Sequence, residues 1–307
     1  YANASKQLTN SVVYTDGTNV GIGTTSPTAK LDVAGSTNIS AGNLDLDNTT
    51  NANQFGVITK NGTRFIHDFN YGDNGTVTTE GRNTFVGLNA GNLTMGSTAT
   101  STSHASYNTG VGYQSLYSNT TGSNNTANGY QALYSNTTGS NNTANGYASL
   151  YSNTTGYQNT ANGYQALYSN TTGSNNSALG YGAGRYIADG TTGRETGNYG
   201  LYLGYNTKAS DQDTTNEIVI GYDAIGIGSN SVVLGNDSIT TTALKGNVGI
   251  GTTGPIHKLE LADHTTPAGG IGFGTDTELY RSAENTLALA SGDSFNLVSG
   301  NLQTGGT

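Results

Sequence analysis

The stretch NTANGYQALYSNTTGSN, from Asn125 to Asn141, is followed at once by a second copy of its first six residues, NTANGY. The same unit starts every 17 residues, at Asn108, Asn125, Asn142, Asn159 and Asn176. A repeat this short has no room for two packed helices, but it fits one coil of a β-solenoid with two short strands and two turns. Gly, Asn and Ser supply the positive φ values that such turns need, and the repeats contain no Pro.

Two tyrosine positions keep the register of this repeat. The first comprises Tyr113, Tyr130, Tyr147, Tyr164 and Tyr181. The second comprises Tyr117, Tyr134, Tyr151 and Tyr168. If the coils stack in register, Tyr130, Tyr147 and Tyr164 form a structural ladder with a step of about 4.8 Å. A helix is disfavoured, because Gly, Asn and Thr have poor helix propensity and no apolar stripe with a period of 3.6 residues runs through the units.

Diverged units flank the regular ones and differ from them at one position. They read NTFVGLNAG (83–91), NYGLYLGYNTKA (198–209), NEIVIGYDA (216–224) and NSVVLGNDS (230–238). Before the shared Gly these units have Val, Leu or Ile, whereas the three central units have Asn128, Asn145 and Asn162. We expect these three to form an amide ladder, inside the roll or at a trimer axis, which fixes the register of the coils. A solvent-facing position, where Asn is merely tolerated, is the alternative.

The composition is that of a repetitive fibre. Only 10% of the residues are charged and 33% are hydrophobic, against about 25% and 45–50% in typical domains. The 20 Tyr and the modest net charge of −9 argue against disorder. The chain has no Cys, and its 11 basic residues form no cluster, so we expect neither disulfides nor nucleic-acid binding. No apolar run approaches the roughly 20 residues of a transmembrane helix, which predicts no membrane insertion.

A second duplication brackets the repeats. NVGIGTTSPTAKLDV (19–33) returns as NVGIGTTGPIHKLEL (247–261), and each copy predicts a short strand, at 30–33 and 258–261. The alternating segments 39–46 and 271–297 predict further strands. The expected domains are an N-terminal β shaft module (1–46), a connecting β segment (47–82), the 17-residue-repeat β-roll (83–190), diverged β-roll coils (191–245) and a C-terminal β shaft module (246–307).

The VGIGTTSP element and the SNTTG-closed units together resemble bacteriophage tail-fibre and related fibre-shaft proteins. The NEIVIGYDA and NSVVLGNDS units resemble the left-handed β-roll heads of trimeric autotransporter adhesins. This resemblance implies an all-β solenoid of the left-handed β-roll type, assembled as a parallel homotrimer. Asn128, Asn145 and Asn162 depart from the pattern, which prefers Val there. Thin apolar cover also favours association, because one coil offers little more than Ala127 and Leu133 for burial.

No catalytic or metal-binding pattern is convincing. The four His (His67, His104, His257 and His264) lack zinc-site spacing, although His257 and His264 with Glu260 and Asp263 are a remote metal candidate. The acidic segment 211–217 reads as a solvated turn in preference to a Ca²⁺ loop. We therefore predict no enzyme activity, no cofactor and no metal.

Two further patterns bear on the surface. The Thr pairs that begin at Thr120, Thr137, Thr154 and Thr171 form a potential ice-binding row. Sequons at Asn119, Asn124, Asn136, Asn141, Asn153, Asn170 and Asn175 would lie in exposed turns if the source glycosylates the chain.

These observations favour a structural fibre, of the phage tail-fibre or receptor-binding-shaft kind, that presents an adhesive tip. A subunit of a bacterial extracellular filament or surface adhesin, polymerising end to end, is the alternative. A glycan-cleaving tail spike and an ice-binding solenoid rank below both. The expected partners are further copies of the chain and a cell-surface glycan or protein receptor. The expected location is extracellular, on a virion or a bacterial surface.

Overall fold

The computed structural model describes residues 13–34, 37, 46–47, 50, 57–250, 253, 259–261, 271–272, 278–283 and 286–289. Within them every regular element is a β-strand and no helix occurs, which confirms the predicted all-β class. The strands are β1 (Val13–Thr15), β2 (Val20–Ile22), β3 (Leu31–Val33), β4 (Ile58–Lys60), β5 (Thr63–His67), β6 (Thr84–Val86), β7 (Thr109–Val111), β8 (Thr126–Asn128), β9 (Thr143–Asn145), β10 (Thr160–Asn162), β11 (Ser177–Leu179), β12 (Leu201–Leu203), β13 (Glu217–Ile220), β14 (Ser231–Leu234), β15 (Val248–Ile250), β16 (Leu259–Leu261), β17 (Ile271–Gly272), β18 (Glu278–Ala283) and β19 (Thr286–Leu289).

Among the described residues the strands form four sheets, which fall in two compact units. Residues 1–238 contain the sheet β1-β2-β3 and an 11-stranded sheet that runs from β4 to β14 in chain order. Residues 239–307 contain the pair β15-β16 and the sheet β17-β18-β19. The long sheet carries the repeats and is the scaffold for every feature considered below.

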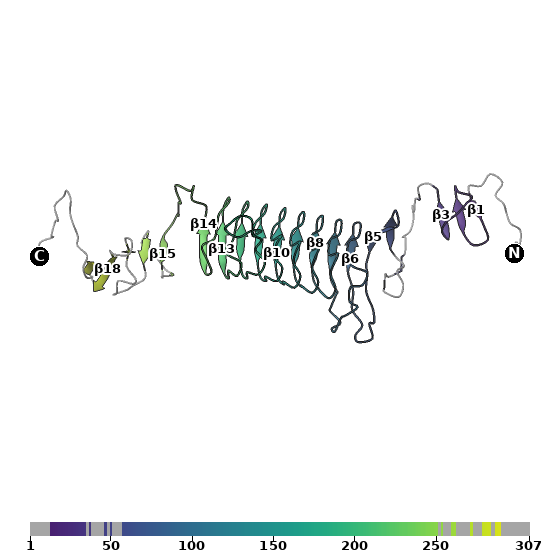
Figure 1. The fold of residues 1–307 in the computed structure, drawn as a ribbon, viewed down its shortest axis with the longest axis horizontal. Coiled ribbons are helices and arrows are strands. Elements are labelled where there is room, and N and C mark those ends of the chain that lie inside the picture. Colours follow the sequence, from purple (N-terminus) through teal and green to yellow (C-terminus); the bar gives the residue numbers. More distant parts are fainter. Residues whose placement is uncertain are drawn as a thin grey trace. The chain divides into compact units, whose positions relative to one another are not determined.

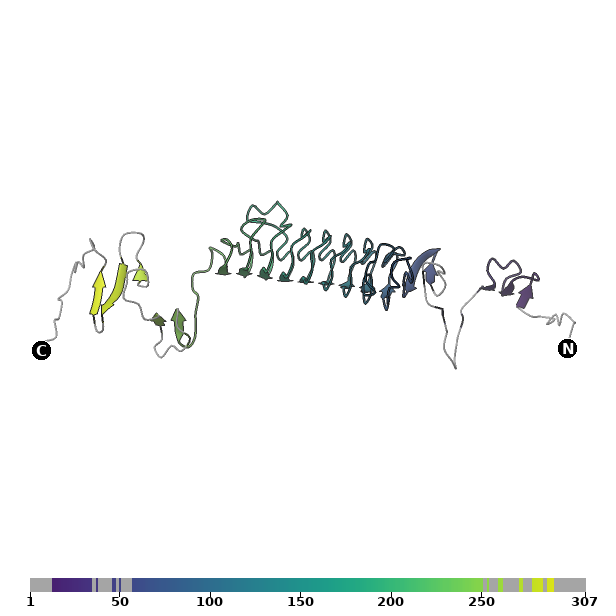
Figure 2. The same cartoon turned by 90° about the horizontal axis from the view of Figure 1, so that it is seen from below.

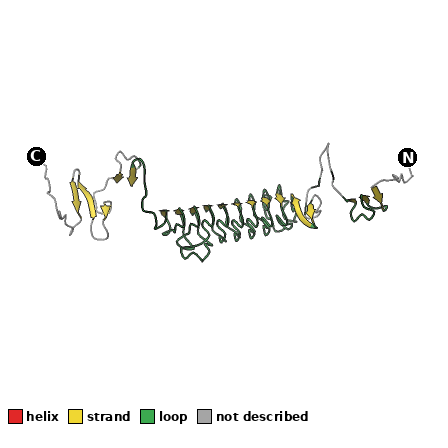
Figure 3. Ribbon diagram, turned by 90° about the horizontal axis from the view of Figure 1, so that it is seen from above, coloured by secondary structure: helices red, strands yellow, loops and turns green. Residues whose placement is uncertain are grey.

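From β6 to β14 each strand of the long sheet pairs in parallel with the next. In the regular units Thr126 lies opposite Thr143, and Thr143 lies opposite Thr160. Figure 1 shows these strands following one another as successive rungs. Figure 3 shows the strands along one side of the stack and the turns along the other. This repetitive arrangement of strands fits a β-solenoid.

Each regular unit contains one strand, so the expectation of two strands per unit is wrong. The opposite side of the unit is a run of turns in which Gln131 and Leu133 have φ angles of 54° and 51°. The backbone there is still bonded from unit to unit: the N–H of Leu133 donates to the carbonyl of Ser149 over 3.1 Å. The alternating positive φ values prevent a pleated strand, and the hydrogen bonds between units hold the turns in place.

The core of the stack is narrow and built from small residues. The middle residue of each regular strand, such as Ala127, Ala144 or Ala161, is fully buried. Leu133, Leu150 and Leu167 face these alanines from the turn side and are also fully buried. Asparagine side chains and small residues such as Ala132 and Ser149 occupy the rest of the interior.

The end of the stack that carries β4 differs from the rest. β4 and β5 form an antiparallel hairpin, and β5 pairs antiparallel with β6. The longer connections around β6 project past the regular turns in Figure 1, and a second long connection, between β11 and β12, stands out in Figure 2. Insertions in the repeat therefore leave the strand register intact and extend the turns.

The duplicated VGIGTT element forms a small parallel pair in both copies. Val20 lies opposite Leu31 in the first copy, and Val248 lies opposite Leu259 in the second. The strands expected at 30–33 and 258–261 are thus present, with bounds one residue shorter. The expected segment 271–297 contains β17, β18 and β19, whereas 39–45 and 290–297 lie outside the described residues.

Candidate functional site

Asn128, Asn145 and Asn162 lie in register on the outer face of the long sheet. The side-chain amide of Asn128 donates to Oδ1 of Asn145 over 2.9 Å, and that of Asn145 donates to Oδ1 of Asn162 over 2.7 Å. Placement inside the roll is wrong, because Asn128 is exposed and the other two are half-buried. Strand alternation turns the alanine before each Asn inward and so turns the Asn outward. Whether this ladder fixes register stays a prediction.

The first tyrosine set forms a continuous stacked column beside that ladder. Ring centroids are 5.0 Å apart between Tyr130 and Tyr147 and 4.9 Å apart between Tyr147 and Tyr164. The column extends to Tyr113 at one end and to Tyr222 at the other. Tyr130, Tyr147 and Tyr164 remain 41–42% exposed. The column therefore offers a stripe of ring edges and hydroxyl groups to the surroundings.

The first Asn of each regular unit is fully buried, a feature that the sequence analysis missed. The column comprises Asn108, Asn125, Asn142, Asn159 and Asn176. In each step Oδ1 accepts from the backbone N–H of the next Asn, as between Asn142 and Asn159 over 2.9 Å. The side-chain amide crosses the interior to a Gly carbonyl, as from Asn142 to Gly156 over 2.8 Å. Each amide thus binds two parts of the chain.

A second buried column runs through Asn119, Asn136, Asn153 and Asn170. Asn136 donates to Oδ1 of Asn119 over 2.8 Å and to the carbonyl of Gly139 over 2.9 Å. These four residues belong to sequons, so the expectation that their turns expose them is wrong. Among the other sequons, Asn124 and Asn141 are exposed and Asn175 is half-buried.

The two members of a Thr pair have different surroundings. The hydroxyl of Thr137 donates to the carbonyl of Thr154 over 3.0 Å, and that of Thr154 donates to the carbonyl of Thr171 over 3.0 Å. The second member is exposed in three of the four pairs, at Thr138, Thr155 and Thr172, whereas Thr121 is half-buried like Thr120. The first hydroxyl of each pair therefore bonds to the next unit, and at most one Thr of each pair is exposed to the solvent.

The predicted metal candidates do not come together in the described residues. His67 is buried beside Phe85, and its Nε2 lies 2.9 Å from the carbonyl oxygen of Ala90. Burial lowers the pKa of His67. His257, His264 and Asp263 lie outside the described residues. No group of three or more His, Asp or Glu that could hold a metal occurs in the part of the chain that the structure describes.

Three polar residues are buried where the repeat diverges. Arg194, Tyr202 and Glu217 are fully buried. The expectation of a solvated turn at 211–217 is therefore wrong for Glu217. Glu217 occupies the register of the first buried Asn column, because Leu201 pairs with Ile218 and Ser177 pairs with Leu201. The phenol of Tyr202 donates to Glu217 Oε2 over 3.2 Å. The N–H of Gly228 donates to Oε1 over 3.0 Å, so the carboxylate has its own set of donors.

The stability of the protein should fall between pH 10 and pH 12 more steeply than that of a Tyr202→Phe variant. Burial raises the pKa of Tyr202 to about 12 from its usual value of 10.0. In this interval the unfolded chain loses the phenol proton and the folded chain keeps it. The contribution present below pH 10 is therefore lost as the pH rises toward 12, by up to about 2–3 kcal/mol. Urea denaturation across this range measures the difference, and parallel curves for the two proteins would refute it.

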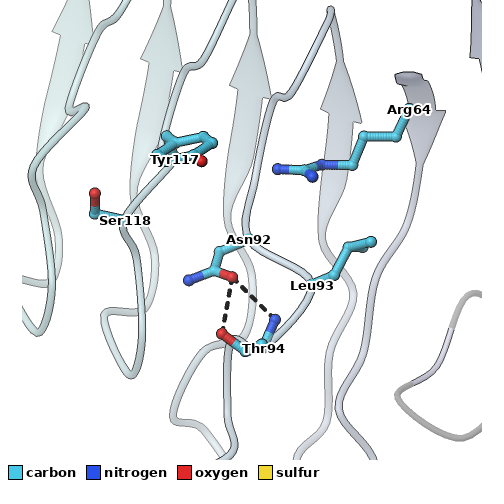
Figure 4. A pocket seen from close by; sticks show the side chains of 6 residues that line it. All are labelled: Arg64, Asn92, Leu93, Thr94, Tyr117 and Ser118. Carbon is cyan, nitrogen blue, oxygen red and sulfur yellow. Dashed lines mark hydrogen bonds between the residues drawn. The ribbon is translucent and has the colours of Figure 1, made fainter. Parts of the chain in front are cut away.

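An open pocket of about 520 Å³ lies beside the end of the second tyrosine column. It is lined by Arg64, Asn92, Leu93, Thr94, Tyr117 and Ser118. Figure 4 shows the guanidinium group of Arg64 pointing toward the ring of Tyr117, with the side chain of Asn92 below them. Partial burial lowers the pKa of Arg64, and Tyr117 opposes this shift, but an arginine stays protonated at neutral pH. This pocket has no signature in the sequence, because its residues come from three separate segments.

Within the described residues, no helix is long and apolar enough to cross a membrane. Comparison of the chain with protein-family models, with characterised proteins and with solved structures finds no significant match.

Proposed function

We propose that the chain is a structural fibre protein whose 17-residue units form a left-handed β-roll shaft. The shaft assembles as a parallel homotrimer of the tail-fibre or receptor-binding kind. It acts outside the cell, on a virion or a bacterial surface, and presents an adhesive tip to a cell-surface glycan or protein receptor.

The parallel stacking of β6 to β14 with side-chain ladders in register supports this role best. In the regular units, backbone hydrogen bonds and the two buried Asn columns recur from unit to unit. Stacked Tyr rings recur with them. A stack whose units contact only their neighbours is a quasi-one-dimensional object that spans distance. Such a design suits a spacer better than it suits a concave catalytic site.

The outward-facing position of each strand supports assembly with other copies. Where it is not Asn it is apolar, and Val111, Leu179 and Leu234 are 41%, 54% and 53% exposed. The neighbouring Tyr column is exposed as well. Association of copies along this flank, which comprises the last strand residue and the Tyr column, would bury apolar surface that a single chain leaves in water.

The oligomeric state tests the proposal. We expect sedimentation equilibrium at micromolar concentration to give three times the chain mass, and negative-stain images to show discrete rods. A Leu179→Asp and Leu203→Asp double variant should dissociate, because six carboxylates would face one another in the trimer. Thr138→Asp, an exposed change on the turn side, is the matched control and should stay trimeric. A folded monomer would refute the trimer, and indefinite filaments would favour the filament subunit instead.

A further inference from the structure

The second tyrosine column is closed at one end by an arginine. Tyr117, Tyr134, Tyr151 and Tyr168 stack with centroid separations of 5.3, 5.1 and 5.0 Å and nearly parallel planes. Beyond the last ring, the guanidinium carbon of Arg185 lies 4.9 Å from the centroid of Tyr168. At this end of the column, two stacked tyrosine rings are thus followed by a guanidinium group.

The other end of the column also has a tyrosine, Tyr117, and an arginine, Arg64, but the position between them has no aromatic ring. Gly91 donates to the carbonyl of Ser115 as Leu116 donates to that of Ala132, so Asn92 occupies the register position before Tyr117. An amide thus stands where the following units have a phenol ring. On the far side of Asn92 lies Arg64, which comes from β5.

Arg64 is held in place by the chain and keeps donor capacity. Its Nε donates to the carbonyl of Ala90 over 3.2 Å, and its Nη2 donates to that of Gly91 over 2.7 Å. These bonds use one side of the planar guanidinium fork, which has five N–H donors in all. The group is therefore pre-positioned and positively charged at the edge of the pocket.

The remaining pocket groups also offer hydrogen-bond donors. Asn92 Oδ1 accepts from the backbone N–H and the hydroxyl of Thr94, both over 2.9 Å (Figure 4). Its acceptor side is therefore engaged within the chain, and its NH₂ group is the side left to donate. With Arg64 and the Ser118 hydroxyl, this lining favours a ligand that carries acceptors and negative charge.

We propose that this pocket is a binding slot for a single aromatic ring that bears an anionic group, stacked between Tyr117 and Arg64. A ring inserted there reproduces the order of Tyr151, Tyr168 and Arg185 at the opposite end of the column. The π face of the ring meets the Tyr face on one side and the cation on the other. A sugar ring has no π face for the guanidinium, so an aromatic ring fits this pair of walls better. The slot lies within one chain and does not depend on the proposed fibre role.

Titration of the full chain with 4-hydroxybenzoate, followed by saturation-transfer NMR, tests the slot. We expect weak, saturable binding that Arg64→Gln reduces by roughly tenfold, through loss of the charge and of the stacked cation. Arg185→Gln makes the same chemical change at the closed end of the column and should leave binding unchanged. Equal loss in both variants, or no loss in either, would overturn the proposal.

A gap-filling variant keeps the test valid if Arg64→Gln fails to fold. Asn92→Tyr places the chain's own ring in the slot, so it should abolish 4-hydroxybenzoate binding and raise the melting temperature. Thr138→Tyr, which adds an exposed ring on the turn side, should do neither. Neutral p-cresol and glucuronate complete the series, and both should bind more weakly than 4-hydroxybenzoate. Equal binding of p-cresol would refute the anionic requirement, and equal binding of glucuronate would refute the aromatic one.

Discussion

Replacing Gly146 with alanine should destabilise the stack by more than about 3 kcal/mol, because it adds a steric clash to backbone strain. A Cβ at this position would lie 2.4 Å from the carbonyl oxygen of Gly163 and 2.7 Å from its carbonyl carbon. Both are backbone atoms, so no side-chain rotation relieves the contact. The φ angle of +136° is a further barrier, since residues with a Cβ rarely adopt it. The two units would have to move apart, and the hydrogen bonds between them would break.

Gly62→Ala is the control that separates the two effects. Gly62 also has a positive φ angle, of +73°, but a Cβ there would meet nothing within 4 Å. It should lower stability by only about 1 kcal/mol, through backbone strain alone. Chemical denaturation of the two variants measures the contrast. Similar losses in both would show that the close approach of units at Gly146 is unimportant.

Asn142→Val should destabilise the protein clearly, whereas Asn145→Val, three residues along in the same unit, should change its stability little. Asn142 is fully buried, and its loss leaves the N–H of Asn159 without its side-chain acceptor. The carbonyl of Gly156 loses the Asn142 donor but keeps the amide of Asn153 over 3.0 Å. A buried N–H without an acceptor costs about 1–3 kcal/mol, so the variant should lose roughly that much stability. Asn145 is half-buried on the outer face, and valine suits a strand, so its replacement should change stability by less than about 1 kcal/mol.

Urea denaturation of the two single variants is the direct measurement. If Asn145→Val were the more damaging change, the outward ladder would be the one that holds the units together. Assembly homogeneity of an Asn128→Val, Asn145→Val and Asn162→Val triple variant addresses register separately. If the outer ladder sets register, this variant should remain as stable as the parent while its assemblies become staggered.

The sequence was sufficient to predict the strand class and the residues that stack on one another. The fixed spacing of Tyr130, Tyr147 and Tyr164 requires only that equivalent residues lie in equivalent places, and their stacked rings follow from that. The spacing does not say which side faces inward. The exchange of Val for Asn at Asn128 suggested a core position, but the fully buried residue is its neighbour Ala127.

The sequence does show that Asn recurs at the positions of both buried columns, but this recurrence was not interpreted as burial. Polar residues such as Asn142 and Asn153 are expected at the surface, and their burial becomes favourable only when every unit repeats the same donors and acceptors. Strict recurrence of Asn at these positions, including at the start of each unit, was the available clue. Alignment by register would also have placed Glu217 in the first column. The Arg64 pocket had no such signal, since it depends on the antiparallel arrival of β5 beside the stack.

The strand register leaves the length of the stack open to change through gene duplication. Neighbouring units exchange hydrogen bonds between residues 17 positions apart, so removal or addition of one whole unit re-forms every bond at the junction. The chain already contains spacings of 25, 24 and 14 between equivalent residues, with strand pairing preserved. Unequal recombination between the near-identical copies would lengthen or shorten the protein in steps of one strand spacing, about 4.8 Å. Adding or removing one unit needs no compensating mutation. The length of the stack can therefore evolve independently of the modules that flank it.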